Sequence, residues 1–581
     1  MALSPAMRRT ATAALAAACL ACSDGGGPVS APGGRDGLDL AYATPRLRVV
    51  AAGEVETVRI ALVVRRRTED GASIPLADAT LVIDRESGRG EPSAATAVTG
   101  PDGLAAIDVR LPAQPDLTRI VFRMASDRGS YLPFDLITAP VVEVALESGE
   151  IRDRLQVPKS GVLLRFRLEP DARAIVMPYQ TDPDRSGAVY RLLHQGASAS
   201  GAATAFGADP PRLPQALAPR GEAGDVIEGE GREGRRALGL AAVPQSLDIQ
   251  SCMVSVSRKA PLRYLGTRIA LYVDAPPDAY QARIDSIGRA FDDQIMPRNT
   301  TLFGPTSDYD GNGVVFVITT PELEDGEGVY CDSIRRVGTE AVFVLWNPEL
   351  PVERLLAVLA HEHQHLVNAG HHVLSDGNVG DERWLNEGLS FAAEALNGYW
   401  YDSLIRMWTF LNGQNGGMSM LPLDYSSAYE DRYMAFVLYL EDRFGPGALG
   451  ALTRSGRRGV PNLEFVTGMP FEDLLRDWFV AVAVSNRGIT DEPRYTYRTI
   501  DLMGMTDEIA QCDCSPVDSF TGMRLEALPL SGSFDVSRML DRADADYYQL
   551  LPPPDSGAGS YDVYFDAFGR EFVQIAVARA R

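Results

Sequence analysis

Histidines are concentrated in one short stretch of this 581-residue chain: five of the six lie within twelve residues. The run HEHQH at 361–365 contains an HExxH motif, in which His361 and His365 are four residues apart. On a helix, residues at this spacing lie on one face about 5–6 Å apart at Cβ, so both imidazoles can bind one metal ion. Glu362 can then reach a water bound to that ion, whereas His363 points away. The chain is therefore constrained to form a helix that carries a histidine-based metal site.

The residues around the motif favour this helix. Apolar residues recur at helical spacing from Val352 to Leu366 and would form its buried face. Pro351 is suited to the start of a helix because a proline needs no N–H partner there, and Gly370 is suited to the end. We therefore expect a helix that begins near Pro351 and ends near Gly370.

A catalytic zinc ion needs a third protein ligand and one position left open for water. Our candidate is Glu387, which lies in the run WLNEGLS at 384–390, 22 residues after His365. Glu394 follows seven residues later and returns to nearly the same face of a helix. There it would hold a ligand histidine or the substrate amine.

The alternative third ligand is His371. It follows His365 by six residues, which is the spacing of the metzincin pattern HExxHxxGxxH, and Asn368 occupies the glycine position. After glycine, asparagine is among the residues most tolerant of a left-handed backbone turn. No later segment clearly resembles the metzincin methionine turn, so we favour Glu387.

Two segments of the chain together resemble the gluzincin metallopeptidases. The run HExxHxxN at 361–368, followed by WLNEGLS and Glu394, is most similar to the hyicolysin family. The wider similarity extends over residues 262–483, under half of the chain. It implies a gluzincin-type α+β core that uses Zn²⁺ as its cofactor. The implied zinc ligands are His361, His365 and Glu387.

The reaction implied by this resemblance is peptide-bond hydrolysis without a covalent intermediate. Zinc lowers the pKa of its bound water towards 7, and Glu362 acts as general base and then delivers the proton to the leaving amine. A hydrogen-bond donor to the oxyanion is also expected, and Tyr429 and Tyr433 are candidates; packing of a tyrosine on a helix is the alternative. Thermolysin-like gluzincins carry an aspartate where this chain has Phe391, so the groups that support its ligands differ.

Strands and helices alternate before and after the motif. Apolar runs predict buried strands at 269–273, 314–318 and 341–346. Helical spacing from Ile284 to Ile295 predicts a helix that Asp278 caps and Pro297 stops. Two longer helices are expected near Leu355 and Trp384. This pattern predicts an α+β catalytic core.

Alternation of apolar and polar residues indicates strands on both sides of this core. Residues 41–148 predict an Ig-like β-sandwich, in which Thr99 to Ala105 resembles part of the bacterial immunoglobulin-like repeats. A small β-rich segment is expected at 149–195 and a small C-terminal β domain at 501–581. Residues 196–245 are crowded with Ala, Gly, Pro and Ser and predict a flexible linker. This leaves 246–500 for the zinc metallopeptidase domain of a multidomain α+β protein.

The first 22 residues are typical of an export signal. Arg8 and Arg9 precede an apolar stretch too short to span a bilayer, and Cys22 is followed at once by a polar, glycine-rich sequence. This resembles a bacterial lipoprotein signal, which implies a lipid on Cys22 and a tether at 23–40. Such signals usually have leucine three residues before the cysteine, where this chain has Cys19, so cleavage at Cys19 and an ordinary secretory signal are the alternatives. We therefore expect an exported protein, anchored by lipid in the bacterial cell envelope (outer membrane or cell surface) or secreted.

The net charge of the chain limits the kinds of partner that it can bind. Lys and Arg number 55 against 78 Asp and Glu, and a net charge of −23 would repel phosphate backbones, so nucleic acid is excluded. The expected partner is a protein or peptide substrate, and the oligomeric state stays open.

Export permits disulfides between the cysteines, and their pairing is also open. The cysteines beyond Cys22 are Cys252, Cys331, Cys512 and Cys514.

Two other functions compete with peptidase activity. One is a catalytically inactive zinc-binding or surface-binding scaffold that acts through the Ig-like domain, although every expected catalytic side chain is present. The other is a lipoprotein that binds sugar or cell wall, which leaves the HExxH helix unexplained. Asp308, Asp310 and Asn312 match the opening of a calcium loop, but Thr319 stands at position twelve, so a tight turn is favoured. His194 is expected to be structural.

Overall fold

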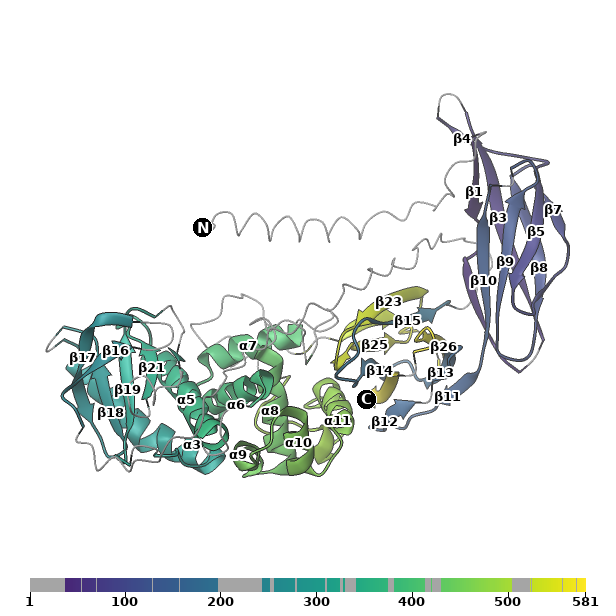
Figure 1. The fold of residues 1–581 in the computed structure, drawn as a ribbon. Helices are drawn as coiled ribbons and strands as arrows, with labels where there is room; N and C mark the ends of the chain where they lie inside the picture. The colour runs from purple at the N-terminus through teal and green to yellow at the C-terminus, as the bar shows by residue number, and fades with distance from the viewer. Residues whose placement is uncertain are drawn as a thin grey trace.

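The computed structural model describes residues 37–580 except 54, 69–70, 128, 156, 197–242, 251–254, 277–278, 309–310, 324–327, 330–340, 375–380, 413–419, 421–429, 504–522, 524, 556 and 571. The expected signal peptide, Cys22, nearly all of the linker and the four other cysteines lie outside these residues. The described parts form two β-sandwiches and an α/β unit rich in helices (Figure 1). Within them, no helix is both long and apolar enough to cross a membrane.

The first β-sandwich contains two five-stranded sheets. Its strands extend from Leu38 to Ala139, whereas the sandwich was predicted at 41–148, and the strand at 141–144 belongs to the second sandwich. One sheet has the order β1-β3-β8-β6 with β4 paired to β3, and the other has the order β2-β10-β9-β5-β7. Every second residue of β3 is buried from Val58 to Val64, so one face of the strand forms the core and the other meets solvent. The strands are β1 (Leu38–Tyr42), β2 (Leu47–Ala51), β3 (Glu56–Arg67), β4 (Ser73–Pro75), β5 (Thr80–Ser87), β6 (Glu91–Pro92), β7 (Thr96–Val98), β8 (Leu104–Leu111), β9 (Asp116–Met124) and β10 (Leu132–Ala139).

The second β-sandwich corrects the predicted division of the chain. The segment at 149–195 and the C-terminal region at 501–581 were expected to be separate, but strands from both lie in the same two sheets. One sheet has the order β11-β13-β26-β15-β23, and the other has the order β12-β27-β14-β25-β22 with β24 paired to β14. The strands are β11 (Val141–Val144), β12 (Ile151–Leu155), β13 (Val162–Leu168), β14 (Arg173–Gln180), β15 (Ala188–His194), β22 (Glu526–Pro529), β23 (Phe534–Leu540), β24 (Asp544–Ala545), β25 (Tyr548–Leu551), β26 (Gly559–Asp566) and β27 (Val573–Ala580).

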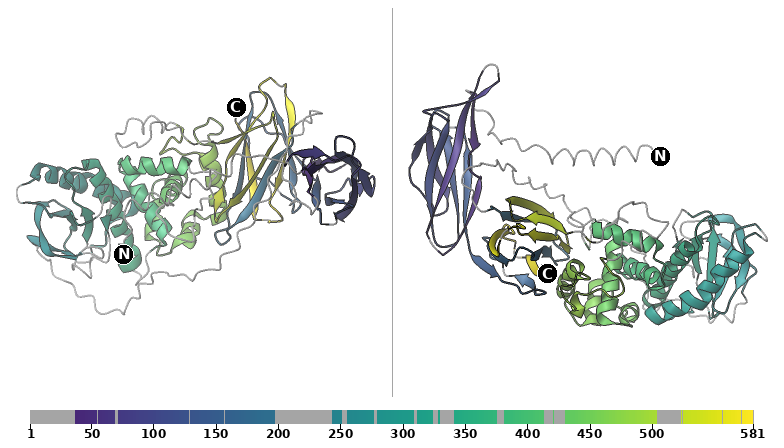
Figure 2. Two further views of the ribbon diagram at one scale, coloured as in Figure 1. Left: turned by 90° about the horizontal axis from the view of Figure 1, so that it is seen from above. Right: turned by 180° about the vertical axis from the view of Figure 1, so that it is seen from behind.

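Strand pairing between residues 149–195 and residues 501–581 explains why neither segment forms a domain of its own. Each provides too few strands to bury two apolar faces, whereas together they enclose one core. The α/β unit is therefore inserted between β15 and β22. Figures 1 and 2 show the second sandwich, with blue and yellow strands side by side, between the first sandwich and the helices.

The α/β unit is built on a six-stranded sheet with the order β16-β17-β18-β19-β21-β20. Its centre is parallel, because β19 pairs in parallel with both β18 and β21, and the three strands predicted there are confirmed. The strands are β16 (Ser246–Gln250), β17 (Ser255–Leu265), β18 (Ile269–Val273), β19 (Val315–Thr320), β20 (Gly328–Val329) and β21 (Ala341–Leu345).

Helices cover this sheet and extend from it towards the second sandwich (Figure 1). The two helices predicted near Leu355 and Trp384 are α5 and α6, which pack against each other. The helices are α2 (Gln281–Ala290), η1 (Phe291–Ile295), α3 (Met296–Phe303), α5 (Val352–Ala369), η2 (Gly370–Leu374), α6 (Arg383–Leu396), α7 (Tyr401–Asn412), α8 (Glu430–Phe444), α9 (Ala448–Arg454), α10 (Gly459–Thr467), α11 (Phe471–Val484) and η4 (Pro493–Tyr495).

One predicted helix end is wrong. Pro297 does not stop its helix: the chain passes through the π-helical η1 into α3, and Pro297 lies in the first turn of α3, where a proline is tolerated. The helix predicted between Pro351 and Gly370 is α5, which ends at Ala369; Gly370 has a φ of −57°, and the π-helical η2 begins there. A Cβ on Gly370 would lie 3.0 Å from Cβ of Ser307, so this glycine also permits a close contact. Asp278, the predicted cap, lies outside the described residues.

Candidate metal site

The HExxH motif lies in the middle of α5, and the WLNEGLS run lies in α6, which faces it. Asn368 of α5 donates a hydrogen bond from Nδ2 to Oδ1 of Asn386 on α6, at 2.5 Å. The asparagines of the two motifs therefore hold the two helices together. This contact fixes the α5 histidines opposite Glu387 of α6.

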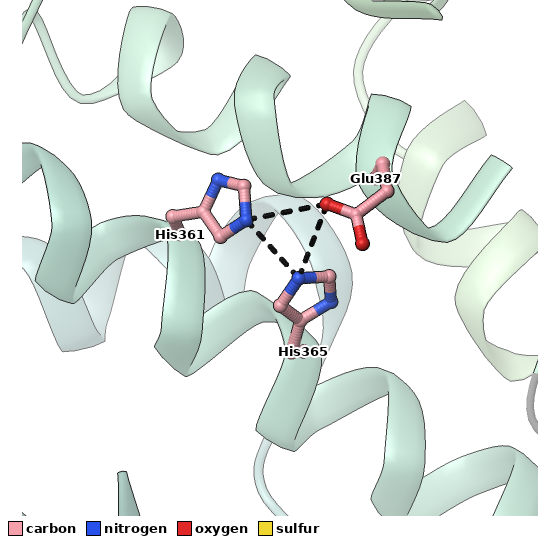
Figure 3. A group of neighbouring side chains, drawn as sticks. All are labelled: His361, His365 and Glu387. Atoms are coloured by element: carbon pink, nitrogen blue, oxygen red, sulfur yellow. Dashed lines mark hydrogen bonds and ion pairs between the residues drawn. The ribbon is translucent and has the colours of Figure 1, made fainter. Parts of the chain in front are cut away.

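Three predicted ligands converge between these helices. Figure 3 shows His361 and His365 reaching from one helix towards Glu387 on the other. The two Nε2 atoms are 3.1 Å apart, and Oε2 of Glu387 lies 3.5 Å from Nε2 of His361 and 3.6 Å from Nε2 of His365. Among the described residues, these three form the group of His, Cys, Asp and Glu side chains whose ligand atoms are close enough to share a metal ion.

The other nitrogen of each histidine has its own partner. Nδ1 of His361 lies 2.8 Å from Oε1 of Glu394, and because an ionised carboxylate only accepts, Nδ1 carries the proton. Nδ1 of His365 lies 2.9 Å from the hydroxyl of Ser390, which lies 2.5 Å from Oε1 of Gln364. If this hydroxyl donates to the Gln364 carbonyl oxygen, it accepts from His365. Both Nε2 atoms then direct lone pairs at the same point.

Of the two side chains that contact the ligand histidines, Glu394 was predicted from the sequence and Ser390 was not. Glu394 was predicted to hold a ligand histidine, and its contact with His361 agrees with that. Ser390 was missed, although it lies one helical turn after Glu387 and so shares the face of α6 that meets α5. That spacing was the available signal.

The pKa values of two of these ligand residues are shifted in the directions expected for a cation-binding site. Burial lowers the pKa of His361, but hydrogen bonds to Glu387 and Glu394 outweigh burial and raise the pKa to about 10. Burial raises the pKa of Glu387, but His365 and His361 outweigh it and hold the pKa well below its usual value. Both shifts favour a positive charge between these side chains.

Phe391 occupies the position where thermolysin-like gluzincins carry an aspartate, and it packs on the site. Its ring centre lies 4.5 Å from that of His361 at an interplanar angle of 65°. The guanidinium carbon of Arg406, on α7, lies 3.9 Å from the centre of the Phe391 ring. The charged support for His361 comes instead from Glu394, seven residues after Glu387.

His363 points away from the ligands, as predicted. Its side chain is fully buried, Nδ1 accepts from Nδ2 of Asn299 at 3.1 Å, and its ring meets that of Phe291 edge to face. Burial lowers the pKa of His363 to about 4, so the imidazole is neutral. Its role is to pack α5 against η1 and α3.

His371, the alternative third ligand, is not part of the converging group. The metzincin alternative requires the chain to turn at Asn368, but α5 remains helical there and continues through η2. Six residues along a helix place His371 on a different side from His365. Its Nε2 lies 3.5 Å from the position that a Cβ on Gly304 would take, beside the end of α3.

The two candidate oxyanion donors are placed differently. Tyr433 lies in the first turn of α8 and its side chain is buried. Tyr429 lies outside the described residues. The role of Tyr433 as a donor stays a prediction.

The remaining polar motifs are structural where they are described. Oδ1 of Asp308 accepts from the backbone N–H of Gly313, and Oδ1 of Asn312 accepts from the N–H of Val314, as in the tight turn that was favoured. His194 is buried, with Nδ1 lying 2.7 Å from the carbonyl oxygen of Asp562.

Comparison with known proteins gives one distant relative. The neutral metalloprotease ShpI of Staphylococcus hyicus is 26% identical over 165 residues, which are 24% of this chain and 36% of the relative. The chain thus spans about a third of the length of the curated relative that it matches. No protein-family model matches the chain.

Solved structures give only faint similarity. The D00-D0 domain of intimin is 19% identical, with 19% of this chain and 50% of that chain covered at a TM-score of 0.15. The secreted serine protease VesC from Vibrio cholerae is 7% identical, with 26% and 39% covered at a TM-score of 0.14. Similarity at this level does not establish a shared fold. The chain is distantly similar to a neutral metalloprotease and places two histidines and a glutamate where a metal ion could bind.

Proposed function

We propose that this protein is an exported, zinc-dependent peptidase with Glu362 as general base. The observation that carries the proposal is the convergence of Nε2 of His361, Nε2 of His365 and Oε2 of Glu387 on one point. Three lone pairs that face one another repel unless a cation lies between them. The distant similarity to a neutral metalloprotease supports the same proposal.

The residues fit zinc. Ligands about 2.1 Å from a tetrahedral zinc ion lie about 3.4 Å from one another. The three distances between the ligand atoms are 3.1, 3.5 and 3.6 Å. Two imidazoles and one carboxylate form a donor set used by catalytic zinc, which keeps a further position for water. Zinc bound here would lower the pKa of that water towards 7 and polarise the scissile carbonyl.

The residues of the chain would then do the following work. Glu362 follows His361 on α5 and is 4% exposed, so its carboxylate is shielded from bulk water. It would take a proton from the attacking water and deliver it to the leaving amine. Glu394 and Ser390 would keep the two imidazoles oriented. Tyr433 would donate to the oxyanion.

The location of the protein is part of the proposal. The sequence of residues 1–22 supports export, and Cys22 supports a lipid anchor. A peptidase outside the cytoplasm would act on proteins or peptides of the cell envelope or the surroundings. The substrate class follows from the zinc site and not from the anchor.

The test is Glu362→Gln. Because Glu362 is the proposed base and not a ligand, this variant should keep its zinc and lose peptide turnover by orders of magnitude. Glu353→Gln is the matched control: it makes the same change in the first turn of α5, at an exposed side chain, and should leave turnover unchanged. Cleavage sites would be read from a proteome-derived peptide library with and without chelator. Full turnover in Glu362→Gln would reject the mechanism, and zinc binding without any cleavage by the wild type would favour the inactive scaffold.

A further inference from the structure

The two helices that carry the proposed ligands meet along one row of polar contacts. The row begins at the hydrogen bond between Asn368 and Asn386 and ends at the contact between His361 and Glu394. Residue numbers rise along α5 while they fall along α6, so the two helices are antiparallel. One turn before His361, the same face of α5 carries the buried Ala357, and α6 ends two residues after Glu394. Alanine has no polar group, so the row cannot continue past the His361–Glu394 contact.

A third helix holds α5 and α6 at this end of the row. Nδ2 of Asn299, on α3, donates to the backbone carbonyl of Ala360 at 2.9 Å and to Nδ1 of His363 at 3.1 Å, both on α5. Oδ1 of Asn299 accepts from Nδ2 of Asn397 at 2.7 Å. Asn397 is the C-terminal cap of α6, and its Nδ2 also donates to the carbonyl of Ala393 at 2.7 Å. One amide on α3 therefore binds both helices.

These hydrogen bonds reach the residues beside the contact that orients His361. Ala360 directly precedes His361 on α5, and Ala393 directly precedes Glu394 on α6. Nδ1 of His361 lies 2.8 Å from Oε1 of Glu394. A hydrogen bond of this length weakens as its two atoms move apart, so it tolerates little displacement of one helix from the other.

The amide of Asn299 is fully buried, at 0% exposure, so bulk water cannot replace its partners. Its two N–H groups face two acceptors on α5, and its oxygen faces a donor on α6. Turning the amide over would place its oxygen against the carbonyl of Ala360 and its NH₂ group against that of Asn397. Buried polar groups without partners cost free energy. The amide therefore has one favourable orientation, which fixes the distances between the three helices.

We propose that Asn299 is a positioning residue of the metal site. It binds α5 just before His361 and α6 just after Glu394, and so it sets the separation of the two helices at the contact that orients this ligand. Its hydrogen bonds go to neighbours of the ligands, so it acts through the His361–Glu394 contact. The inference rests on the proposed function for its kinetic consequences, and on metal binding alone for its structural ones.

The experiment measures three quantities in the full chain. These are Zn²⁺ affinity, by competition with a chromogenic chelator, kcat and KM on a peptide substrate at saturating zinc, and the unfolding temperature. Asn299→Ala removes the amide. We expect zinc affinity to fall about tenfold or more, and kcat to fall while KM changes little.

A double-mutant cycle with Glu394→Ala separates positioning from a general loosening of the fold. Glu394→Ala removes the contact that Asn299 is proposed to set. Adding Asn299→Ala to that variant should therefore lower zinc affinity by no more than about twofold further. A second full loss, as large as in the single variant, would show that Asn299 acts independently of Glu394 and would overturn the proposal.

Asn462→Ala is the matched control. Asn462, on α10, is equally buried, and its Nδ2 donates to the backbone carbonyl of Leu452 on α9 at 2.9 Å. Its Oδ1 accepts from the hydroxyl of Ser455. We expect this variant to lower the unfolding temperature without changing zinc affinity. If Asn299→Ala behaves like this control, with a lower unfolding temperature and unchanged zinc affinity and kcat, the positioning role is rejected.

Asn397→Ala keeps the proposal testable if Asn299→Ala does not fold. Asn397 is half-buried at the end of α6, and its truncation removes the hydrogen bond that joins Asn299 to that helix. Zinc affinity should again fall about tenfold, and wild-type affinity in this variant would overturn the proposal. Zinc affinity is read without substrate, so a wild-type protein that binds zinc and cleaves no peptide would reject the peptidase function and not the positioning role.

Discussion

Glu394 accepts a hydrogen bond from Nδ1 of His361 at 2.8 Å, and it belongs to the same helix as Glu387, which lies 3.5 Å from the opposite nitrogen of that imidazole. One helix thus provides both a ligand and the group that orients another ligand. The carboxylate increases the basicity of His361 and fixes its tautomer. Metal affinity should therefore depend on Glu394, although the Glu394 carboxylate would not contact the metal ion.

Glu394→Gln should weaken zinc binding about 10- to 100-fold. The amide oxygen can still accept a hydrogen bond from Nδ1 of His361. The negative charge that strengthens His361 as a metal ligand is lost. Competition with a chelator of known affinity measures the change. Glu464→Gln, which alters a carboxylate on α10, is the control and should bind zinc like the wild type. Equal affinity in Glu394→Gln and the control would contradict a role for Glu394.

Ser390→Ala should weaken zinc binding by a smaller factor, about tenfold. The substitution removes the partner of Nδ1 of His365 and also leaves Oε1 of Gln364 without the hydroxyl that lies 2.5 Å away. No charge is lost, so the effect should stay below that of Glu394→Gln. Ser403→Ala is the comparison, because its hydroxyl lies 3.4 Å from Oε2 of Glu394, whereas His361 contacts the other oxygen of that carboxylate. If Ser390→Ala binds zinc as tightly as Ser403→Ala, the Ser390 contact does not support the site.

Glu387→Ala should lose zinc at concentrations where His371→Ala keeps it. Removing a ligand leaves two imidazoles and opens the site to water, whereas His371 lies beside the end of α3. Zinc content after dialysis, measured by atomic absorption, separates the two variants. Loss of zinc from His371→Ala alone would mean that the gluzincin-like ligand set is wrong.

The parts of the site that the sequence predicts are those set by helical spacing. His361 and His365 are four apart on one helix, and Glu387 and Glu394 are seven apart on another, so each pair needs only local geometry. Ser390 shares the helix and the face of Glu387, but a serine three residues from a glutamate is so common that this spacing is too weak a signal to identify it. Its role depends on how α6 meets α5, which spacing within one helix does not determine.

The second sandwich was divided wrongly for a related reason. Strand β14 pairs with β27, and the residues of that ladder are about 400 positions apart, so local patterns could not join them. The run Ala174 to Tyr179 is nonetheless buried at every position instead of alternating. A continuous apolar strand is typical of a sheet that is covered on both faces. This was the signal that the strand meets other layers of the protein.

Cys22→Ser should release the protein from membranes, if the sequence of residues 1–22 is a lipoprotein signal. Acyl chains contribute about 0.8 kcal/mol per buried methylene, so a lipid-modified chain partitions into detergent and an unmodified one does not. Phase separation in detergent followed by immunoblotting makes the comparison. Cys19→Ser is the control and should stay in the detergent phase. A wild-type protein in the aqueous phase would contradict the anchor.

Stability should fall as the pH rises from about 4 to about 8, through Asp544. Burial, and then the charge of Asp546, raise the pKa of Asp544 to about 8 in the folded protein, from 3.8 for the free side chain. Between these values the unfolded chain binds fewer protons at this site than the folded chain, so the free energy of unfolding decreases with pH. Each unit of pKa difference corresponds to about 1.4 kcal/mol, which allows an effect of a few kcal/mol.

Asp544→Asn removes the titrating group, so its unfolding temperature should depend less on pH than that of the wild type in thermal melts at pH 5 and pH 8. Glu472→Gln, a change on α11 away from Asp544, should keep the wild-type dependence. Identical pH dependence in Asp544→Asn and the wild type would show that Asp544 does not titrate between pH 5 and pH 8.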